Sequence, residues 1–230
     1  MVAQSSADSS RSQTLDRGLR ALNLIATSPA PLTIDEVAEQ LDLGRSVTYR
    51  MIRTLEDHRL VVRDASGRLT GGTQLVVLAG GVSAEMKAIA APILTDLANT
   101  LEMTSFLVVP EDQEAVTVQV AEPTSTAAHV AYRPGTRHPL DRGAPGIALL
   151  AGLDPQPNER AEVTTARNSG WAYSEGEVIK GMASIAAPIT TNDGTTKAAV
   201  AVVHLALSLN SHDVAPLVVS AANTLGLKLS

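Results

Sequence analysis

The sequence contains no cysteine and few aromatic residues, and each shortage excludes a class of site. Without cysteine the chain has no disulfide scaffold, thiol nucleophile, iron–sulfur cluster or cysteine-ligated zinc. Aromatic residues make up only 2% of the 230 residues, which argues against a surface that stacks nucleic acid bases on aromatic rings. Hydrophobic residues still account for 44%, so we expect a sizeable core of alanine, valine, leucine and isoleucine and exclude a wholly disordered chain.

Long hydrophobic runs are also missing. The most apolar stretch, residues 198–209, is interrupted by His204 and Ser208 and is far shorter than the roughly 20 residues that cross a bilayer. Residues 1–13 are rich in serine and hold no apolar run, so we expect a flexible, disordered tail there and no secretory signal. With the absence of cysteine, these features predict a cytoplasmic protein with no membrane partner.

Charge is unevenly distributed along the chain. The net charge is -6, which by itself argues against a nucleic acid partner. Residues 1–70, however, balance nine arginines against nine acidic groups, and residues 45–70 carry six arginines against three acidic groups. Arginine has the forked geometry that suits phosphates and guanine edges. The alternative is a solvated surface with a chance excess of arginine.

The first 72 residues predict a winged helix-turn-helix domain over residues 14–72. Apolar residues at helical spacing predict the first helix, and Thr33 and Glu36 form the capping box that opens the second. Residues 64–67 have hairpin turn chemistry. In chain order the predicted elements are a helix over 15–26, a helix from 33, a turn at 42–44, a helix over 45–58 and extended runs at 60–63 and 68–70.

The third predicted helix has two unlike faces. Val47, Met51 and Leu55 gather on one side with Ile52 at its margin, whereas polar side chains gather on the other. In a helix-turn-helix this polar side reads the major groove of DNA. The alternative is an ordinary amphipathic helix, whose polar side is only exposed to solvent. The residues predicted in the major groove are Ser46, Tyr49, Arg50 and Arg53. Those predicted on phosphates or the neighbouring minor groove are Arg45, Arg63 and Arg68.

The remaining sequence predicts a linker helix over residues 73–85 and an α/β domain over 86–230, so the fold class is α+β. The sheet is expected to be largely antiparallel because hairpins dominate, above all the one at Asn192-Asp193-Gly194. The expected strands are 105–110, 115–121, 129–132, 182–190 and 198–207. The expected helices are 86–101, with Pro92 inside it, 143–151, 158–168 and a last helix that runs toward Gly226.

Four stretches together resemble the IclR family of bacterial transcriptional regulators. They are residues 41–50 (LDLGRSVTYR), 133–140 (RPGTRHPL), 146–151 (GIALLA) and 170–188, which contains GWAYSEGE and GMASIAAP. The resemblance covers nearly the whole chain. It implies a GAF-like effector-binding domain after the winged helix. It also implies homodimers, which in the family often pair into tetramers, and binding to a palindromic double-stranded operator under the control of a small-molecule effector.

The resemblance also assigns an effector site. The chain departs from the family at Ile147, where lysine is usual, and in a shorter stretch between Ala151 and Gly170, so the ligand cannot be copied from other members. The matching positions are Ala127, Val130, His138, Ala144, Pro145, Ser174, Met182, Ser184, Ala201 and Val203. The alternative is that these residues only pack a sheet against a helix.

The residues themselves indicate an acidic effector. A loop that opens a helix presents unpaired backbone N–H groups, which seat a carboxylate, and Gly143 and Gly146 allow close approach while Pro145 removes one donor. Hydroxyls of Ser174 and Ser184 add contacts among apolar walls. We therefore expect a repressor that senses a small organic-acid or amino-acid-like metabolite.

Enzyme and metal chemistry are weakly supported. Ser184, His138 and Asp141 could be combined as a hydrolase triad, but no Gly-x-Ser-x-Gly elbow is present. The five histidines lack metal-ligand spacing, and no phosphate-binding glycine motif occurs, so we expect no catalytic residues, metal or cofactor. A third hypothesis is a ligand-sensing protein whose winged helix binds protein; a purely protein-facing surface has no electrostatic need for the arginines of residues 45–68.

Overall fold

The computed structural model describes residues 12–126, 129–206 and 210–230. The chain divides between Val82 and Ser83 into two compact units, which are described separately. Of the expectations above, most of the disordered tail and the effector residue Ala127 lie outside the described residues.

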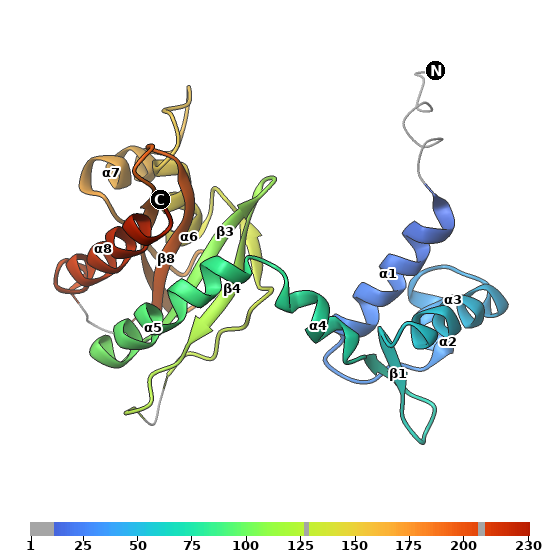
Figure 1. Ribbon diagram of the computed structural model, residues 1–230. Coiled ribbons are helices and arrows are strands. Elements are labelled where there is room, and N and C mark those ends of the chain that lie inside the picture. Colours follow the sequence, from blue (N-terminus) through green and yellow to red (C-terminus); the bar gives the residue numbers. More distant parts are fainter. Residues whose placement is uncertain (1–11, 127–128, 207–209) are drawn as a thin grey trace, which may run out of the picture. The chain divides into compact units, whose positions relative to one another are not determined.

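The first unit contains the predicted order of helices and strands (Figure 1). It consists of α1 (Gln13–Thr27), α2 (Ile34–Gln40), α3 (Arg45–Asp57), β1 (Val61–Arg63), β2 (Leu69–Gly71) and α4 (Gln74–Gly80). The capping box is present: the Thr33 N–H donates to Glu36 Oε2 at 2.6 Å, and the Glu36 N–H donates to Thr33 Oγ1 at 3.2 Å. These bonds satisfy two of the N–H groups that every helix leaves free at its start.

The core of this unit fixes how α3 is turned. Thr48 and Ile52 are fully buried, and Met51 and Leu55 are nearly so, against α1, α2 and the strands. Val47, expected on the buried side, is only half-buried. Thr48 lies nearer the centre of the buried face, and its hydroxyl is satisfied by the Gly44 carbonyl at 3.3 Å. The opposite face of α3 is therefore left to solvent.

The two strands form the predicted wing. They pair antiparallel with Val62 opposite Thr70. The turn between them is held by Asp64, whose Oδ1 accepts the N–H groups of Ser66 and Arg68, both at 2.9 Å. These bonds and the Ser66 hydroxyl keep the pKa of Asp64 below its usual value. Gly67 takes the left-handed backbone conformation (φ +83°) that closes such a turn with little strain.

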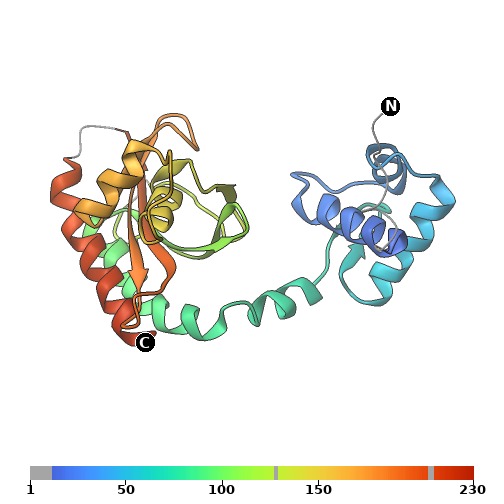
Figure 2. The same ribbon diagram turned by 90° about the horizontal axis from the view of Figure 1, so that it is seen from above.

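The second unit is a six-stranded antiparallel sheet with two helices on each face (Figure 2). The strand order is β5-β4-β3-β8-β7-β6. The strands are β3 (Thr104–Glu111), β4 (Glu114–Ala121), β5 (Arg137–Pro139), β6 (Ala172–Glu175), β7 (Met182–Thr190) and β8 (Thr196–Leu205). The helices are α5 (Ala84–Leu101), α6 (Gly143–Ala151), α7 (Ala161–Ser169) and α8 (Ser211–Lys228).

Two hydrophobic cores lie on opposite faces of this sheet because side chains alternate along each strand. On β8, Val200 and Val202 pack toward α5 and α8, whereas Ala201 and Val203 pack toward α6 and α7. Both cores are buried, which explains why β7 and β8 read as nearly continuous apolar runs in the sequence. The small alanines on the α6 side leave room for a helix close to the sheet.

One expected strand is absent, and two short strands, β5 and β6, were not predicted. Residues 129–132 are not a strand: the Val130 carbonyl accepts the Thr104 hydroxyl at 2.6 Å instead of a ladder bond. The strand beside β4 is β5, in which His138 pairs with Ala115. The short strand β6 was missed, because four residues between two glycines carry too little alternation to be recognised.

No single helix in the described ranges is long and apolar enough to cross a membrane. Helices α4 and α5 taken together reach that length and composition, but the chain bends sharply between them. On α5 the residues Ala90, Leu94, Leu97 and Ala98 are buried within the second unit.

Candidate functional site

The outer face of α3 is the first candidate site. Ser46, Tyr49, Arg50 and Arg53 are all exposed, as predicted, and Tyr49 keeps 44% of its surface open. Within the described part of the chain, the guanidinium groups of Arg50 and Arg53 have no ion pair or hydrogen bond. The face thus presents two unneutralised positive charges and two hydroxyls near the start of a helix.

The other three predicted arginines are already engaged. Arg45 pairs with Asp35 at 3.0 Å, and Arg68 donates to the Pro31 carbonyl at 2.9 Å. Arg63 forms a two-pronged pair with Glu56 of α3, at 3.0 and 3.3 Å, which raises the pKa of Arg63. This pair ties the wing to α3, so Arg63 has a structural role besides the predicted contact. Contacts from these side chains to another molecule would have to share or replace the present partners.

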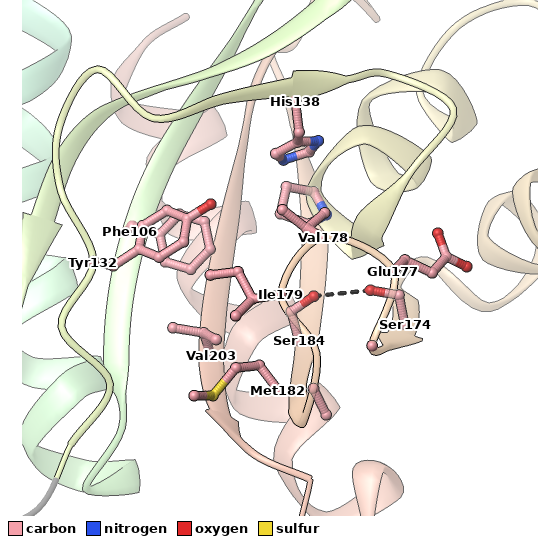
Figure 3. A pocket seen from close by; sticks show the side chains of 13 residues that line it. Phe106, Tyr132, His138, Ser174, Glu177, Val178, Ile179, Met182, Ser184 and Val203 are labelled. Atoms are coloured by element: carbon pink, nitrogen blue, oxygen red, sulfur yellow. Dashed lines mark hydrogen bonds between the residues drawn. The ribbon is translucent and has the colours of Figure 1, made fainter. Parts of the chain in front are cut away.

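The second candidate site is a small cavity in the second unit, between the sheet, the start of α6 and residues 176–179 (Figure 3). Six of the ten predicted effector residues line it: His138, Pro145, Ser174, Met182, Ser184 and Val203. Ala201 is buried in the same core without lining the cavity, and Val130 lines a neighbouring hollow. Ala144 contributes its backbone N–H, which donates to Ser174 Oγ at 2.7 Å.

Seven lining residues were not predicted: Phe106, Tyr132, Gly176, Glu177, Val178, Ile179 and Ala183. Phe106 and Tyr132 are two of the five aromatic residues, and their rings stack 4.4 Å apart. Their pairing depends on the loop at 129–134 and could not be deduced from spacing. The signal that was available is the pair of glycines, Gly176 and Gly181, that brackets residues 177–180 inside the quoted motif.

The expected free N–H groups at the start of α6 are not free. The Gly143 N–H donates to Glu177 Oε2 at 2.8 Å, and the Ala144 N–H is used by Ser174. Pro145 has no N–H, and from Gly146 onward the N–H groups can reach carbonyls four residues earlier in the helix. The prediction of an open seat for a carboxylate was therefore wrong in this conformation, because the chain's own Glu177 occupies it.

The cavity is also too small for a metabolite as it stands. Its volume is about 30 Å³, whereas ligand pockets typically measure about 300–1,000 Å³. An adjoining hollow of about 590 Å³ shares Ile179, Met182 and Val203 with it.

Gly146 serves a different purpose from the one expected. A side chain there would meet the backbone of the chain itself, because a Cβ would lie 2.3 Å from the Leu140 carbonyl oxygen. The glycine lets α6 pack against the segment that leads into it. It does not open a path to a ligand.

Substituting Gly146 by alanine is expected to lower the free energy of unfolding of the second unit by about 1–3 kcal/mol, the usual cost of forcing atoms into a packed site. Trp171, the single tryptophan of the chain, lies in this unit and reports its urea unfolding. Gly18→Ala is the matched control, because a Cβ at Gly18 in α1 meets nothing within 4 Å. Equal unfolding midpoints for the two variants would contradict the packing argument.

The cavity shows no hydrolytic arrangement among its described residues. Ser184 Oγ is bonded to Ser174 Oγ at 3.0 Å, and His138 Nδ1 lies 3.1 Å from the Pro139 carbonyl, so neither residue serves the other. Across the described residues no group of three or more histidine, aspartate or glutamate side chains is placed to hold a metal ion.

Comparison with known families gives two matches. Residues 14–65 match the IclR helix-turn-helix domain, and residues 156–230 match the C-terminal domain of the bacterial transcriptional regulator IclR. Among curated proteins, the HTH-type transcriptional regulator Rv1719 of Mycobacterium tuberculosis is 30% identical over 198 residues, covering 76% of each chain. The glycerol operon regulatory protein of Streptomyces griseus is 27% identical and covers 77% of this chain and 78% of its own.

Solved structures share the fold. An IclR homolog from Microbacterium hydrocarbonoxydans, in complex with 4-hydroxybenzoate, has a TM-score of 0.81 at 19% identity, covering 95% of this chain and 100% of its own. An IclR regulator from Alicyclobacillus acidocaldarius has a TM-score of 0.80 at 22% identity, covering 94% and 98%. With the matching relatives and the winged helix described above, these findings show that the chain belongs to the IclR family of bacterial, DNA-binding transcriptional regulators.

Proposed function

We propose that this regulator is a repressor that binds a palindromic operator as a homodimer, and that a small organic-acid or amino-acid-like metabolite modulates this binding. The observation that carries the DNA-binding surface is the outer face of α3, where Arg50 and Arg53 are exposed and unpaired in the described structure. We place Ser46, Tyr49, Arg50 and Arg53 in the major groove and Arg45, Arg63 and Arg68 on the backbone or in the adjacent minor groove.

Exposed apolar helices support the homodimer. Helix α4 has no buried residue, and Val76, Val77 and Leu78 are 76, 67 and 57% exposed. On α1, Leu15 and Leu19 are 61 and 55% exposed. A seven-residue apolar helix has little stability alone, and exposed apolar residues of this number mark interaction surfaces. A second copy of the same unit would cover them, and a twofold dimer matches a palindromic operator. Pairing of such dimers into tetramers would appear in sedimentation velocity as a species of four chains.

The cavity of the second unit supports a small effector with an apolar body. Its walls are mostly apolar, its aromatic pair suits a planar group, and its hydroxyls lie beside the start of α6. A structural neighbour in complex with 4-hydroxybenzoate makes small carboxylic acids the first compounds to screen.

DNA binding is tested by fluorescence anisotropy with duplexes that tile the region upstream of the protein's own gene. A sequence-specific regulator should bind one palindromic duplex about 10³-fold or more tightly than scrambled DNA at physiological salt. The alternative, a winged helix that binds protein, is favoured if no duplex is bound even at low salt.

Ser184→Leu is expected to abolish the response of DNA binding to any acid that the wild type senses, because leucine fills the cavity and removes a hydroxyl. Binding to the operator without ligand should stay unchanged, since α3 is in the other unit. Anisotropy titrations with and without the acid measure both quantities. Ser220→Leu, at an exposed position of α8, is the control, and a Ser184→Leu protein that still responds normally would remove Ser184 from the site.

A further inference from the structure

The segment of residues 176–181, here called the cover segment, closes the effector cavity. It joins β6 to β7 and is bracketed by Gly176 (φ +68°) and Gly181 (φ +77°), whose left-handed conformations favour glycine. Its Val178 and Ile179 side chains line the cavity, yet each is about 40% exposed to solvent. Figure 3 shows both lying across the space between His138 and Met182. The segment therefore forms one wall of the cavity on its inner side and is exposed to solvent on its outer side.

The hydrogen bonds of Glu177 to Gly143 and Arg160, here called the latch, hold the cover segment in place. Glu177 Oε2 accepts the Gly143 N–H at 2.8 Å and an Nη1 hydrogen of Arg160 at 3.1 Å, and Oε1 accepts from Nη2 of Arg160 at 2.9 Å. The Arg160 guanidinium and the Gly143 N–H together keep the pKa of Glu177 below its ordinary value. Glu177 is therefore an ionised carboxylate at neutral pH, seated on the start of α6 and on one arginine.

This carboxylate occupies the donors that an acidic effector would need. Because Glu177 accepts the Gly143 N–H and Ser174 accepts the Ala144 N–H, the first turn of α6 offers no further N–H to a ligand. Four of the five N–H groups of Arg160 are engaged as well, since it also pairs with Glu162 at 3.2 Å and donates to the Asp141 carbonyl at 2.5 Å. An incoming acid can bridge the Gly143 N–H and the guanidinium of Arg160 only by taking the place of Glu177.

A second, independent feature points to a ligand in the same cavity. His138 lines the cavity and is only 5% exposed, and its Nε2 has no hydrogen-bond partner. Its Nδ1 lies 3.1 Å from the Pro139 carbonyl, so Nε2 is the nitrogen left for another group. Buried polar atoms without partners are rare because each costs about 1–3 kcal/mol. A ligand hydroxyl, or water admitted with it, would satisfy this atom once the cover segment moves.

We propose that Glu177 is an internal competitor for the effector: a monocarboxylate with an apolar body enters by exchanging its carboxylate for that of Glu177 on Gly143 and Arg160, which releases the cover segment. This proposal rests on the proposed acid-sensing function and adds the residue that sets its selectivity. Exchange of one carboxylate for another preserves the charge-assisted hydrogen bonds of the seat. A neutral ligand cannot replace them and would leave Arg160 without one counter-ion.

The seat is tested by chemical rescue in the full-length protein. In Glu177→Ala the side-chain carboxylate is gone, so added acetate or propionate should bind in its place and raise the thermal midpoint saturably. The half-saturating concentration should be at least about tenfold lower than in the wild type. Acetamide, the neutral counterpart of acetate, should have no such effect. Glu162→Ala is the matched control, because Glu162 also pairs with Arg160 but, among the described residues, accepts no hydrogen bond from an N–H of α6. A Glu177→Ala protein that responds to acetate no better than this control would overturn the proposal.

Release of the cover segment is tested by limited trypsin digestion, because the exposed Lys180 lies within it. Glu177→Gln keeps the shape of the side chain and guards against a folding defect in the alanine variant. Cleavage after Lys180, identified by mass spectrometry, should be several-fold faster in Glu177→Gln than in the wild type or Glu162→Gln. Equal cleavage rates would show that Glu177 does not hold the segment. Both readouts are independent of DNA, so failure of the latch is distinguishable from failure of the acid-sensing function, which appears as unchanged operator binding with every acid.

Discussion

Replacing both Arg50 and Arg53 by alanine is expected to weaken binding to the specific operator by about 30-fold or more, since each arginine that reads a base is worth about 1–3 kcal/mol. The two guanidinium groups are exposed and carry no ion pair in the described structure, so no internal partner has to be broken before they reach DNA. Both lie on the face of α3 opposite to the buried Thr48 and Ile52, so folding should be unaffected. Anisotropy titration of the operator and of scrambled DNA measures the loss and shows that it is specific.

Arg68→Ala is the informative comparison for this pair. Arg68 already donates to the Pro31 carbonyl and lies 3.7 Å from Glu36. We therefore expect its side chain to contact a DNA phosphate and no base. Its loss should weaken all sequences alike and lower the slope of log affinity against log salt by about one. If the double variant of α3 binds the operator as the wild type does across the salt titration, the assignment of α3 to the major groove is wrong.

Placing a carboxylate on the apolar surface of the first unit is expected to abolish dimer formation. Val77→Glu or Leu19→Glu would bury two like charges in a twofold interface, one from each copy. An uncompensated buried charge costs about 3–5 kcal/mol, which corresponds to a rise of about 100-fold or more in the dimer dissociation constant. Sedimentation velocity measures this constant, and affinity for a palindromic operator should fall with it because each half-site is then bound separately.

Leu153→Glu provides the control for the dimer prediction. Leu153 is 51% exposed, a fraction similar to the 55% of Leu19, but it belongs to the second unit, after α6. The substitution therefore adds the same charge at a comparable exposure in the unit that does not contain α1 and α4. Sedimentation that is unchanged in Val77→Glu and Leu19→Glu would show that another surface joins the copies.

The first unit was largely predictable because its signals are local. The capping box at Thr33 and Glu36, the periodicity of α3 and the turn at Asp64 each depend on residues only a few positions apart. The exposed face of α3 followed from the same periodicity. Even here burial was misjudged at Val47, and the buried Thr48 was not predicted, because a small hydroxyl near the centre of a face can be buried when a nearby carbonyl accepts its hydrogen bond.

The cavity was predicted only in part. The resemblance to the family brought together six lining residues, but it did not reveal the aromatic pair of Phe106 and Tyr132 or the cover segment. Those neighbours come from a strand, an irregular loop and the β6–β7 connection. Their meeting depends on the strand order of the sheet, which no short-range pattern encodes.

The amino-acid sequence by itself determined the class of the protein: a winged helix with an arginine-rich outer face, followed by an antiparallel sheet packed by small apolar residues. It also predicted that the start of α6 borders the candidate effector site. Only the tertiary structure decided that this start is occupied, because Glu177 and Arg160, 17 positions apart, meet Gly143 through the folding of three separate elements. A backbone N–H at the start of a helix can be bonded to an acceptor far away in the sequence, and only the folded structure shows where that acceptor lies.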